Sequence, residues 1–325
     1  MKNRIYDSIL ETIGETPLIE LSRIVEKEGV EGRIFGKMEL ISPGLSKKDR
    51  VALGIIEAAE KSGKLKKGQK VVELTSGNFG TGLAIVCKQK GYDFIAVMSK
   101  GNSIERAIMI KAFGAEIVLV DQCPESIPGQ VSGADLARVE EKAQELTKEY
   151  GAFRVDQFLN DDNVGASYER TAPEIIEQMG DTKIDVFADF MGSGGTFTGI
   201  AKALKEHNPE IECIIVEPEN AAFYTKGEPG KGGHVIQGGG YNQALKFVEN
   251  NKYIVDGVVT ISDEDAVATE RDLAEYEGIF AGPSSGANVK AALNLLKDKY
   301  KGKNIVVLIP DSGTKYLSTD IWDIM

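Results

Sequence analysis

The chain has 325 residues, of which 42% are hydrophobic and 27% are charged, and it contains 36 glycines. This length favours two domains, and the composition is typical of an ordered, loop-rich α/β protein. The formal net charge of −12 argues against nucleic acid as a partner, because binding a phosphate backbone needs a basic face.

The cysteines, histidines and apolar runs exclude further classes. Cys87, Cys123 and Cys213 are widely scattered, which excludes a CxxC pair and argues against a disulfide framework. His207 and His234 lie far apart, so a histidine metal cluster is not expected. We see neither a secretory signal nor an apolar run of the roughly 20 residues that a membrane helix needs. We therefore expect a cytoplasmic protein without a membrane partner.

Short β-branched runs alternate with amphipathic stretches along most of the chain. This alternation predicts an α/β fold with open, twisted, mostly parallel sheets and helices on both faces. The predicted strands are Val71–Leu74, Phe94–Met98, Ile117–Val120, Asp185–Ala188, Ile211–Val216 and Asn304–Ile309. The predicted helices are Val51–Lys61, Phe79–Lys90, Ser103–Phe113, Leu136–Lys148 and Ala287–Lys297.

Local signals mark several ends of these elements. Asn102 with Glu105 three residues later predicts a helix N-cap, and Gly91 and Gly114 predict helix ends. The segment Asp121–Gly133 carries two prolines and two glycines, and is longer than most connections in such units. We interpret it as an ordered loop or lid.

Three Gly- and Ser-rich turns follow a predicted strand or open a predicted helix, where an α/β sheet places its ligands. Free backbone N–H groups and the positive end of a helix favour an anion at such a turn. Each turn alone is explained equally well by a tight connection with a Ser or Thr cap, whereas the combination favours a ligand site. The turns are Thr75–Gly80, Gly192–Thr196 and Gly282–Ala287.

Lys48 is the candidate catalytic residue, at the end of the turn Ser42–Lys47 and the start of a predicted helix. The helix dipole disfavours a cation there, which lowers the amine pKa and assists a nucleophile. On the residues alone, a solvated Lys-Lys-Asp-Arg charge run is the better explanation. A family resemblance reverses this preference.

With Lys48 and the three turns in this order, the chain closely resembles the cysteine synthase (O-acetylserine sulfhydrylase) and cystathionine β-synthase family. The resemblance runs from Ile13–Leu18 to Pro310–Thr319 and covers nearly the whole chain. It implies pyridoxal 5'-phosphate as cofactor, bound in the cleft between two α/β domains of the tryptophan-synthase-β type, usually in a homodimer. We expect a smaller domain of residues 42–152 and a larger domain of residues 8–41 and 153–325.

The resemblance also implies roles for individual residues. Lys48 falls on the lysine that carries the cofactor as a Schiff base, because Asp49 and Arg50 fix the register. Asn78 falls on the residue that meets the phenolic oxygen of the cofactor, and Ser284 on the residue that faces the pyridine nitrogen. The phosphate loop falls on Gly192, Ser193, Gly194, Gly195 and Thr196, and the substrate carboxylate contacts fall on Thr75, Ser76 and Gln157.

The implied reaction is β-replacement on a serine or cysteine derivative. The substrate displaces Lys48 from the cofactor, the freed amine acts as general base, and the cofactor is the electron sink. Loss of the β-leaving group gives an aminoacrylate intermediate, which accepts a nucleophile or hydrolyses to pyruvate.

Several residues depart from the family pattern around this site. Phe79 stands where a second threonine is usual, Leu45 replaces a glycine, Asp156 replaces a glutamine, and Asp189 and Phe190 replace small residues. Repacking of a buried helix start explains Phe79 as well as a role in substrate choice does. Because the departures cluster, we place Phe79 and Asp156 among the candidate substrate-binding residues and expect altered substrates.

Functions of three kinds remain open at this stage. Cysteine synthase-like β-replacement is the leading hypothesis. The alternatives are an enzyme that consumes L-cysteine, releases hydrogen sulfide and gives serine, lanthionine or pyruvate, or one with cystathionine synthase-like activity. A third class is a cofactor-binding protein that works by docking, as relatives dock the tail of serine acetyltransferase. Lys48, Asn78, Ser284 and the complete phosphate loop weigh against the third class.

Overall fold

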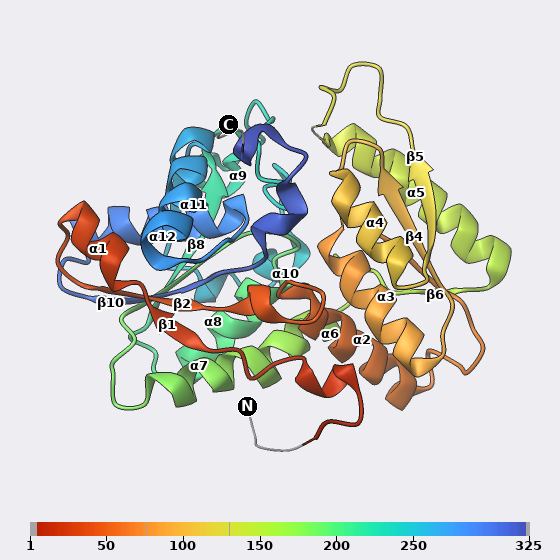
Figure 1. The fold of residues 1–325 in the computed structure, drawn as a ribbon, viewed down its shortest axis with the longest axis horizontal. Helices are drawn as coiled ribbons and strands as arrows, with labels where there is room; N and C mark the ends of the chain where they lie inside the picture. Colours follow the sequence, from red (N-terminus) through yellow and green to blue (C-terminus); the bar gives the residue numbers. More distant parts are fainter. Residues whose placement is uncertain (1–4, 76, 130, 323–325) are drawn as a thin grey trace.

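The structure is a computed structural model that describes residues 5–75, 77–129 and 131–322. Its strands form two separate sheets, which confirms the predicted α/β class (Figure 1). The six-stranded sheet has the order β1-β2-β10-β7-β8-β9, in which β1 and β2 are antiparallel and all other neighbours are parallel. The four-stranded sheet has the order β5-β4-β3-β6 and is parallel throughout.

The strand bounds are as follows. The six-stranded sheet contains β1 Leu18–Glu20, β2 Arg33–Lys37, β10 Asn304–Leu308, β7 Val186–Phe190, β8 Glu212–Pro218 and β9 Gly257–Ile261. The four-stranded sheet contains β5 Glu116–Val120, β4 Phe94–Ser99, β3 Val71–Leu74 and β6 Phe153–Arg154.

Helices cover both faces of the four-stranded sheet, because successive side chains of a strand point to opposite faces. Val72 and Ile95 pack with α5 on one face. Val71 and Ala96 pack on the other face with α2, α3 and α4. These helices are α2 Lys48–Ser62, α3 Asn78–Lys90, α4 Ile104–Ala112 and α5 Gly133–Tyr150.

The six-stranded sheet is layered in the same way. Ile34, Val186 and Ile305 pack with α1, α11 and α12 on one face, and Phe187 and Val306 pack with α7 and α8 on the other. The layer helices are α1 Ser22–Glu28, α7 Ala172–Met179, α8 Gly195–His207, α11 Asp263–Glu277 and α12 Pro283–Lys297. Shorter helices are α6 Asp162–Ala166, α9 Phe223–Lys226 and α10 Lys246–Glu249, with 3-10 turns η2 Glu39–Ile41 and η6 Gly313–Tyr316.

We call the six-stranded sheet with its helices the larger lobe, and the four-stranded sheet with its helices the smaller lobe. The C-terminal segment after β10, drawn in dark blue in Figure 1, lies on the side of the larger lobe that faces α4. Ser103 Oγ, at the start of α4, donates to the Lys315 carbonyl at 2.8 Å. Ser318 donates to the Glu105 carboxylate through its backbone and its hydroxyl. The two lobes are therefore joined by polar contacts far along the chain from the Ser42–Lys47 connection.

Several predicted element bounds are corrected by the structure. The N-cap of α4 is Ser103, not Asn102, whose side chain instead donates to the Ser99 carbonyl at 3.0 Å. Helix α12 begins at Pro283, four residues earlier than expected, because proline is well suited to a first helical turn. Gly91 is confirmed as a helix end, with a left-handed φ of +80°. The domain limits at residues 42 and 152 stay a prediction, while β6, just beyond 152, pairs with β3.

Cys87, Cys123 and Cys213 are free and buried. Among the described residues, no helix has both the length and the apolar character of a membrane span. Within the same ranges, no group of three His, Cys, Asp or Glu side chains is arranged to hold a metal ion.

Candidate active site

Lys48 opens α2 and is almost fully buried, with 9% of its surface exposed. Its Nζ donates to Gln157 Oε1 at 3.4 Å. Burial, and after it the positive charge of Lys47, lowers the pKa of Lys48 to about 7. Much of this amine is therefore neutral near pH 7, and only a neutral amine is a nucleophile or a base.

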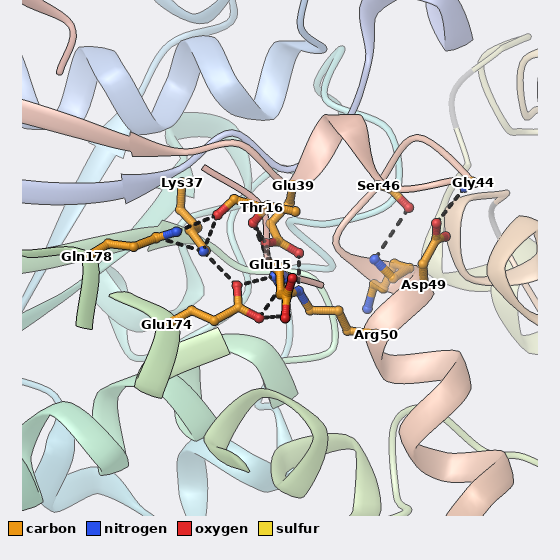
Figure 2. Close-up of polar contacts among 11 residues, drawn as sticks. Glu15, Thr16, Lys37, Glu39, Gly44, Ser46, Asp49, Arg50, Glu174 and Gln178 are labelled. Atoms are coloured by element: carbon orange, nitrogen blue, oxygen red, sulfur yellow. Dashed lines mark hydrogen bonds and ion pairs between the residues drawn. The ribbon is translucent and has the colours of Figure 1, made fainter. Parts of the chain in front are cut away.

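A buried ion-pair network fixes the first turn of α2 (Figure 2). Arg50 donates to both oxygens of Glu39 at 2.8 and 2.9 Å, and to both oxygens of Glu174 at 2.7 Å. Lys37 also donates to Glu174, at 2.7 Å. Although burial opposes it, Arg50 and then Lys37 lower the pKa of Glu174 to about 2. Because Arg50 is two residues after Lys48, this network ties the lysine to β2, η2 and α7.

Two of the departures from the family pattern adopt a left-handed backbone. Leu45 has a φ of +59° and Asp156 has a φ of +55°, a conformation that costs a non-glycine residue about 1–2 kcal/mol. Leu45 is held by hydrogen bonds to Ser42 and Ser312. Asp156 is held because its N–H donates to Glu73 at 2.7 Å, and its Oδ1 accepts from the Leu159 N–H at 3.1 Å. These strained turns directly precede Ser46–Lys48 and Gln157.

The turn after β3 brings Asn78 and Phe79 beside the same site. Thr75 Oγ1 accepts from the N–H groups of Gly77 and Gly80 at 3.0 and 2.8 Å, which closes the turn. Gly77 has a φ of +130°, and a Cβ there would collide with the Arg106 side chain, so glycine is required. The Phe79 ring is buried, and its centroid lies 5.9 Å from Lys48 Nζ. Ser76 lies outside the described residues.

The loop between β7 and α8 has the form of an anion site. Gly192, Ser193, Gly194 and Thr196 line a small pocket together with Lys48, and the loop opens the 13-residue helix α8. The hydroxyl of Thr196 is buried and has no hydrogen-bond partner among the described residues. Backbone N–H groups at a helix N-terminus, with an unsatisfied hydroxyl beside them, are suited to a phosphate.

Asn163, on α6, supports this loop and was not expected from the sequence. Its Nδ2 donates to Ser193 Oγ at 3.0 Å and to the Gln157 carbonyl at 2.6 Å. A Cβ on Gly195 would collide with the Asn163 amide, so the loop and Asn163 fit only because residue 195 is glycine. No sequence signal pointed to Asn163, because Ser193 is 30 residues away along the chain and Gln157, six residues away, lies in an irregular segment.

The third turn opens α12. Ser284 is half-buried at the second helical position, and the neighbouring Ser285 is buried with an unpartnered hydroxyl in the described structure. Figure 1 places α12 in the larger lobe, across the sheet from α8. The serine pair is thus held on the same lobe as the anion loop.

Two further residues of the site come from the C-terminal segment. Asp311 Oδ2 accepts from Asn78 Nδ2 at 2.6 Å and from the Tyr316 hydroxyl at 2.7 Å. Lys315 Nζ, fully buried, donates to Asn78 Oδ1 at 2.8 Å and to the Gly44 carbonyl at 2.6 Å. The segment Pro310–Thr319 was noticed only as part of the resemblance, which assigned it no role.

A cavity of about 990 Å³ adjoins these turns. It is lined from the smaller sheet's side by residues 100–104 and by the described part of the loop 125–136, and from the other side by 231–242 and 318–321. Gly238 belongs to its wall, and a Cβ on Gly192 would lie 3.3 Å from the Gly238 carbonyl and 4.0 Å from Lys48 Nζ. The wall of the cavity therefore comes close to Gly192, and the described part of the segment Asp121–Gly133 borders the cavity.

The residues present fit pyridoxal 5'-phosphate. A buried amine with a lowered pKa, a glycine-rich loop at a helix N-terminus and an unsatisfied Thr196 hydroxyl meet the needs of an aldehyde and of a phosphate. The fold and the site thus define a pyridoxal-phosphate enzyme of the two-domain α/β type.

Comparisons with known proteins also indicate a pyridoxal-phosphate enzyme. The chain matches the family described as "Pyridoxal-phosphate dependent enzyme" over residues 9–311. It is 38% identical to a cysteine synthase of Staphylococcus aureus (strain Mu50 / ATCC 700699) over 324 residues, covering 99% of both chains. It is also 38% identical to the O-ureido-L-serine synthase of Streptomyces lavendulae over 323 residues, covering 98% of this chain and 93% of the relative.

Solved structures give the same result. A cysteine synthase of Entamoeba histolytica has a TM-score of 0.90 at 37% identity, covering 100% of this chain and 93% of that one. A hydrogen sulfide-producing enzyme of Fusobacterium nucleatum has a TM-score of 0.87 at 39% identity, covering 96% of this chain and 100% of that one. The chain therefore belongs to the family of pyridoxal-phosphate dependent enzymes, among the cysteine synthases and their relatives. It uses pyridoxal phosphate for β-replacement on small amino-acid substrates.

Proposed function

We propose that Lys48 binds the cofactor covalently and then serves as the base at the substrate Cα. Its burial, its place beside Gly192 and its hydrogen bond to Gln157 support this role. When bound, pyridoxal phosphate supplies the electron sink for carbanion chemistry at Cα. A lysine pKa of about 7 allows the Nζ atom both to accept and to return a proton near neutral pH.

The remaining proposed cofactor contacts follow from the three turns. The loop residues Gly192, Ser193, Gly194, Gly195 and Thr196 would hold the phosphate through backbone N–H groups and hydroxyls. Asn78 would donate to the phenolic oxygen with its second amide hydrogen, since the first goes to Asp311. Ser284 would face the pyridine nitrogen from the start of α12.

The proposed substrate subsite lies around Gln157 and the turn after β3. Gln157 Nε2 donates to the Leu74 carbonyl at 3.3 Å, which orients its amide toward Lys48. Thr75 keeps its hydroxyl hydrogen for a substrate carboxylate, because its oxygen already accepts from two backbone N–H groups. Ser76 and Asp156 are retained in this subsite on the resemblance alone. Phe79 would exclude water from the Lys48 side, because it is 2% exposed.

We propose formation of cysteine from O-acetyl-L-serine and sulfide as the reaction, in place of the altered substrates that the departures at Phe79 and Asp156 led us to expect. The observation that carries this choice is the 38% identity to a cysteine synthase over 99% of both chains, with the lysine, the turns and the loop all present. The test supplies the purified enzyme with O-acetyl-L-serine and sulfide, and separately with L-cysteine alone. We expect cysteine formation to be the faster reaction by at least about tenfold in kcat/KM.

A second candidate is release of hydrogen sulfide from L-cysteine. It is favoured by the similarity to the Fusobacterium nucleatum hydrogen sulfide-producing enzyme and by the clustered departures at Phe79 and Asp189. Faster sulfide release from cysteine alone than cysteine formation would replace the first proposal with this one. Product analysis for serine, lanthionine and pyruvate would then identify the nucleophile.

A homodimer, docking of a serine acetyltransferase tail and a cytoplasmic location complete the proposal. They rest on the family resemblance and, for the location, on three free cysteines. Sedimentation of the purified protein tests the dimer, and a pull-down with a serine acetyltransferase tests the docking. Cell fractionation tests the location.

A further inference from the structure

Lys47 and Asp189 form an ion pair beside the candidate cofactor lysine. Lys47 Nζ lies 2.7 Å from Asp189 Oδ2, with only 12% and 1% of the two side chains exposed. Lys47 is the N-cap of α2, which packs against the four-stranded sheet, whereas Asp189 lies in β7 near the middle of the other sheet. The pair therefore crosses between the two lobes, next to Lys48.

Both residues line the same small pocket as Lys48 and the anion loop. Asp189 is three residues before Gly192, where the anion loop begins. A phosphate ester carries about two negative charges at pH 7, and a bare carboxylate in the same poorly hydrated pocket would repel it. An aspartate is thus an unfavourable residue here unless its charge is compensated.

The hydrogen bonds of Asp189 show how its charge is compensated. Its Oδ2 accepts a hydrogen bond from Lys47 Nζ at 2.7 Å, and its Oδ1 accepts one from Asn288 Nδ2 at 3.1 Å. Asn288, on α12, is itself fixed because the same Nδ2 donates to the Leu308 carbonyl at 2.9 Å. The carboxylate is therefore turned toward Lys47 and α12, with both oxygens engaged.

We propose that Lys47 is a positioning residue which neutralises Asp189 and so makes the anion loop able to bind the phosphate of the cofactor. The inference rests on the proposed function of Lys48 and of the loop 192–196. It adds Lys47, Asp189 and Asn288 to the site as a unit that acts through charge compensation, without contact to the reacting atoms.

The pair also acts on the charge of Lys48. Lys47 lowers the pKa of Lys48, second to burial, whereas Asp189 and then Glu73 raise it. We therefore expect the Lys48 pKa to rise when only Lys47 is removed and to fall when only Asp189 is removed. The double variant should lie between the two single variants, which a purely structural role of the pair would not produce.

The test compares the affinity of the apoprotein for pyridoxal phosphate in four proteins: wild type, Lys47→Met, Asp189→Asn, and the double variant. Binding is followed by the absorbance of the bound cofactor. We expect Lys47→Met to weaken binding at least about tenfold, Asp189→Asn to bind at least as well as wild type, and the double variant to return to within about threefold of wild type. Lys90→Met, which removes a more exposed ion pair on α3, is the matched control and should bind as wild type does.

The pH midpoint of cofactor loading is the second readout. It should rise in Lys47→Met, fall in Asp189→Asn and lie between these two in the double variant. Wild-type-like binding by Lys47→Met overturns the inference, as does weak binding by Asp189→Asn. A double variant as weak as Lys47→Met also overturns it, because Lys47 would then act on the phosphate directly. If wild type itself binds no cofactor, or Lys48→Ala loads covalently as wild type does, the proposed function fails instead.

Discussion

Asn78 donates to Asp311 at 2.6 Å, although the two residues are 233 positions apart in the chain. The same amide accepts from Lys315 at 2.8 Å, so the C-terminal segment holds the first residue of α3 from two sides. Lys315 is also bonded to the Gly44 carbonyl, four residues before Lys48. One short segment therefore sets the relative positions of the turn after β3 and of the turn that leads into α2.

Replacement of Lys48 gives the most direct test of the site. Lys48→Ala should abolish covalent cofactor binding and lower kcat by at least about a thousandfold, because both the anchoring amine and the base are lost. Lys61→Ala, an exposed lysine in the last turn of the same helix, is the matched control. The absorbance spectrum and the mass of the reduced holoprotein report the linkage. A Lys48→Ala protein that keeps the linkage would refute the assignment.

The pH dependence of cofactor loading follows from the lowered pKa of Lys48. Burial brings this pKa to about 7, so about half of the amine is neutral and reactive at pH 7, and this fraction levels off only about one to two pH units higher. The rate of covalent loading of the apoprotein should follow the same curve, measured by stopped-flow absorbance between pH 5.5 and 9.5, a range chosen to span roughly two units about the pKa. A rate that keeps rising toward pH 10 would mean that the amine behaves like an ordinary exposed lysine.

Gly195 should tolerate no side chain. In Gly195→Ala the new methyl group displaces Asn163, which loses its bonds to Ser193 and Gln157. We expect affinity for pyridoxal phosphate to fall at least about tenfold. Gly165→Ala, on neighbouring α6, has open space around its Cβ and should bind the cofactor normally. Equal affinities in the two variants would contradict the packing argument.

The ion-pair network around Arg50, in the first turn of α2, should contribute more to the free energy of unfolding than an exposed ion pair does. Arg50→Met leaves Glu39 and Glu174 without their shared partner, and loss of one member of a buried pair costs about 3–5 kcal/mol. Arg33→Met removes the exposed pair with Glu20 and should cost less than about 1 kcal/mol. Urea unfolding of the two variants measures the difference. Similar losses in both would show that the network is not buried in solution.

Glu270, on α11, should make stability depend on pH. It is fully buried with no hydrogen-bond partner for either carboxyl oxygen among the described residues. Burial, followed by the charge of Asp311, raises its pKa from 4.5 to about 9. Because the folded pKa lies above the unfolded one, the folded state holds this proton more tightly. Its contribution to stability is present below about pH 4.5 and is lost as the pH rises toward 9.

Glu270→Gln removes this titration. We expect the variant to exceed wild type in free energy of unfolding by roughly 1–3 kcal/mol at pH 8, with the difference shrinking toward pH 4.5. Urea unfolding at several pH values measures it, with the exposed Glu275→Gln on the same helix as control. A difference that does not change with pH would show that Glu270 does not titrate as proposed.

The sequence predicted the α/β class because buried parallel strands and amphipathic helices leave local, periodic patterns. It missed β1 and β9 because these strands are only partly buried along most of their length, so their apolar pattern is weak. It also missed β2, although four of its five residues are buried. It also missed α11, whose residues are largely acidic and carry a weak apolar stripe. The predicted N-cap at Asn102 was wrong because α4 begins at Ile104, which makes Ser103 the N-cap.

The sequence by itself was enough to propose the lysine and the anion turns, because they lie in contiguous segments whose order and spacing match a known family. Only the tertiary structure decided what surrounds them. Asn163, Asp311, Lys315 and the Lys47–Asp189 pair reach the site across many residues of chain, and no local pattern encodes such contacts. Burial in the folded protein also lowers the Lys48 pKa to about 7, turning what looked like a surface charge into a reactive amine.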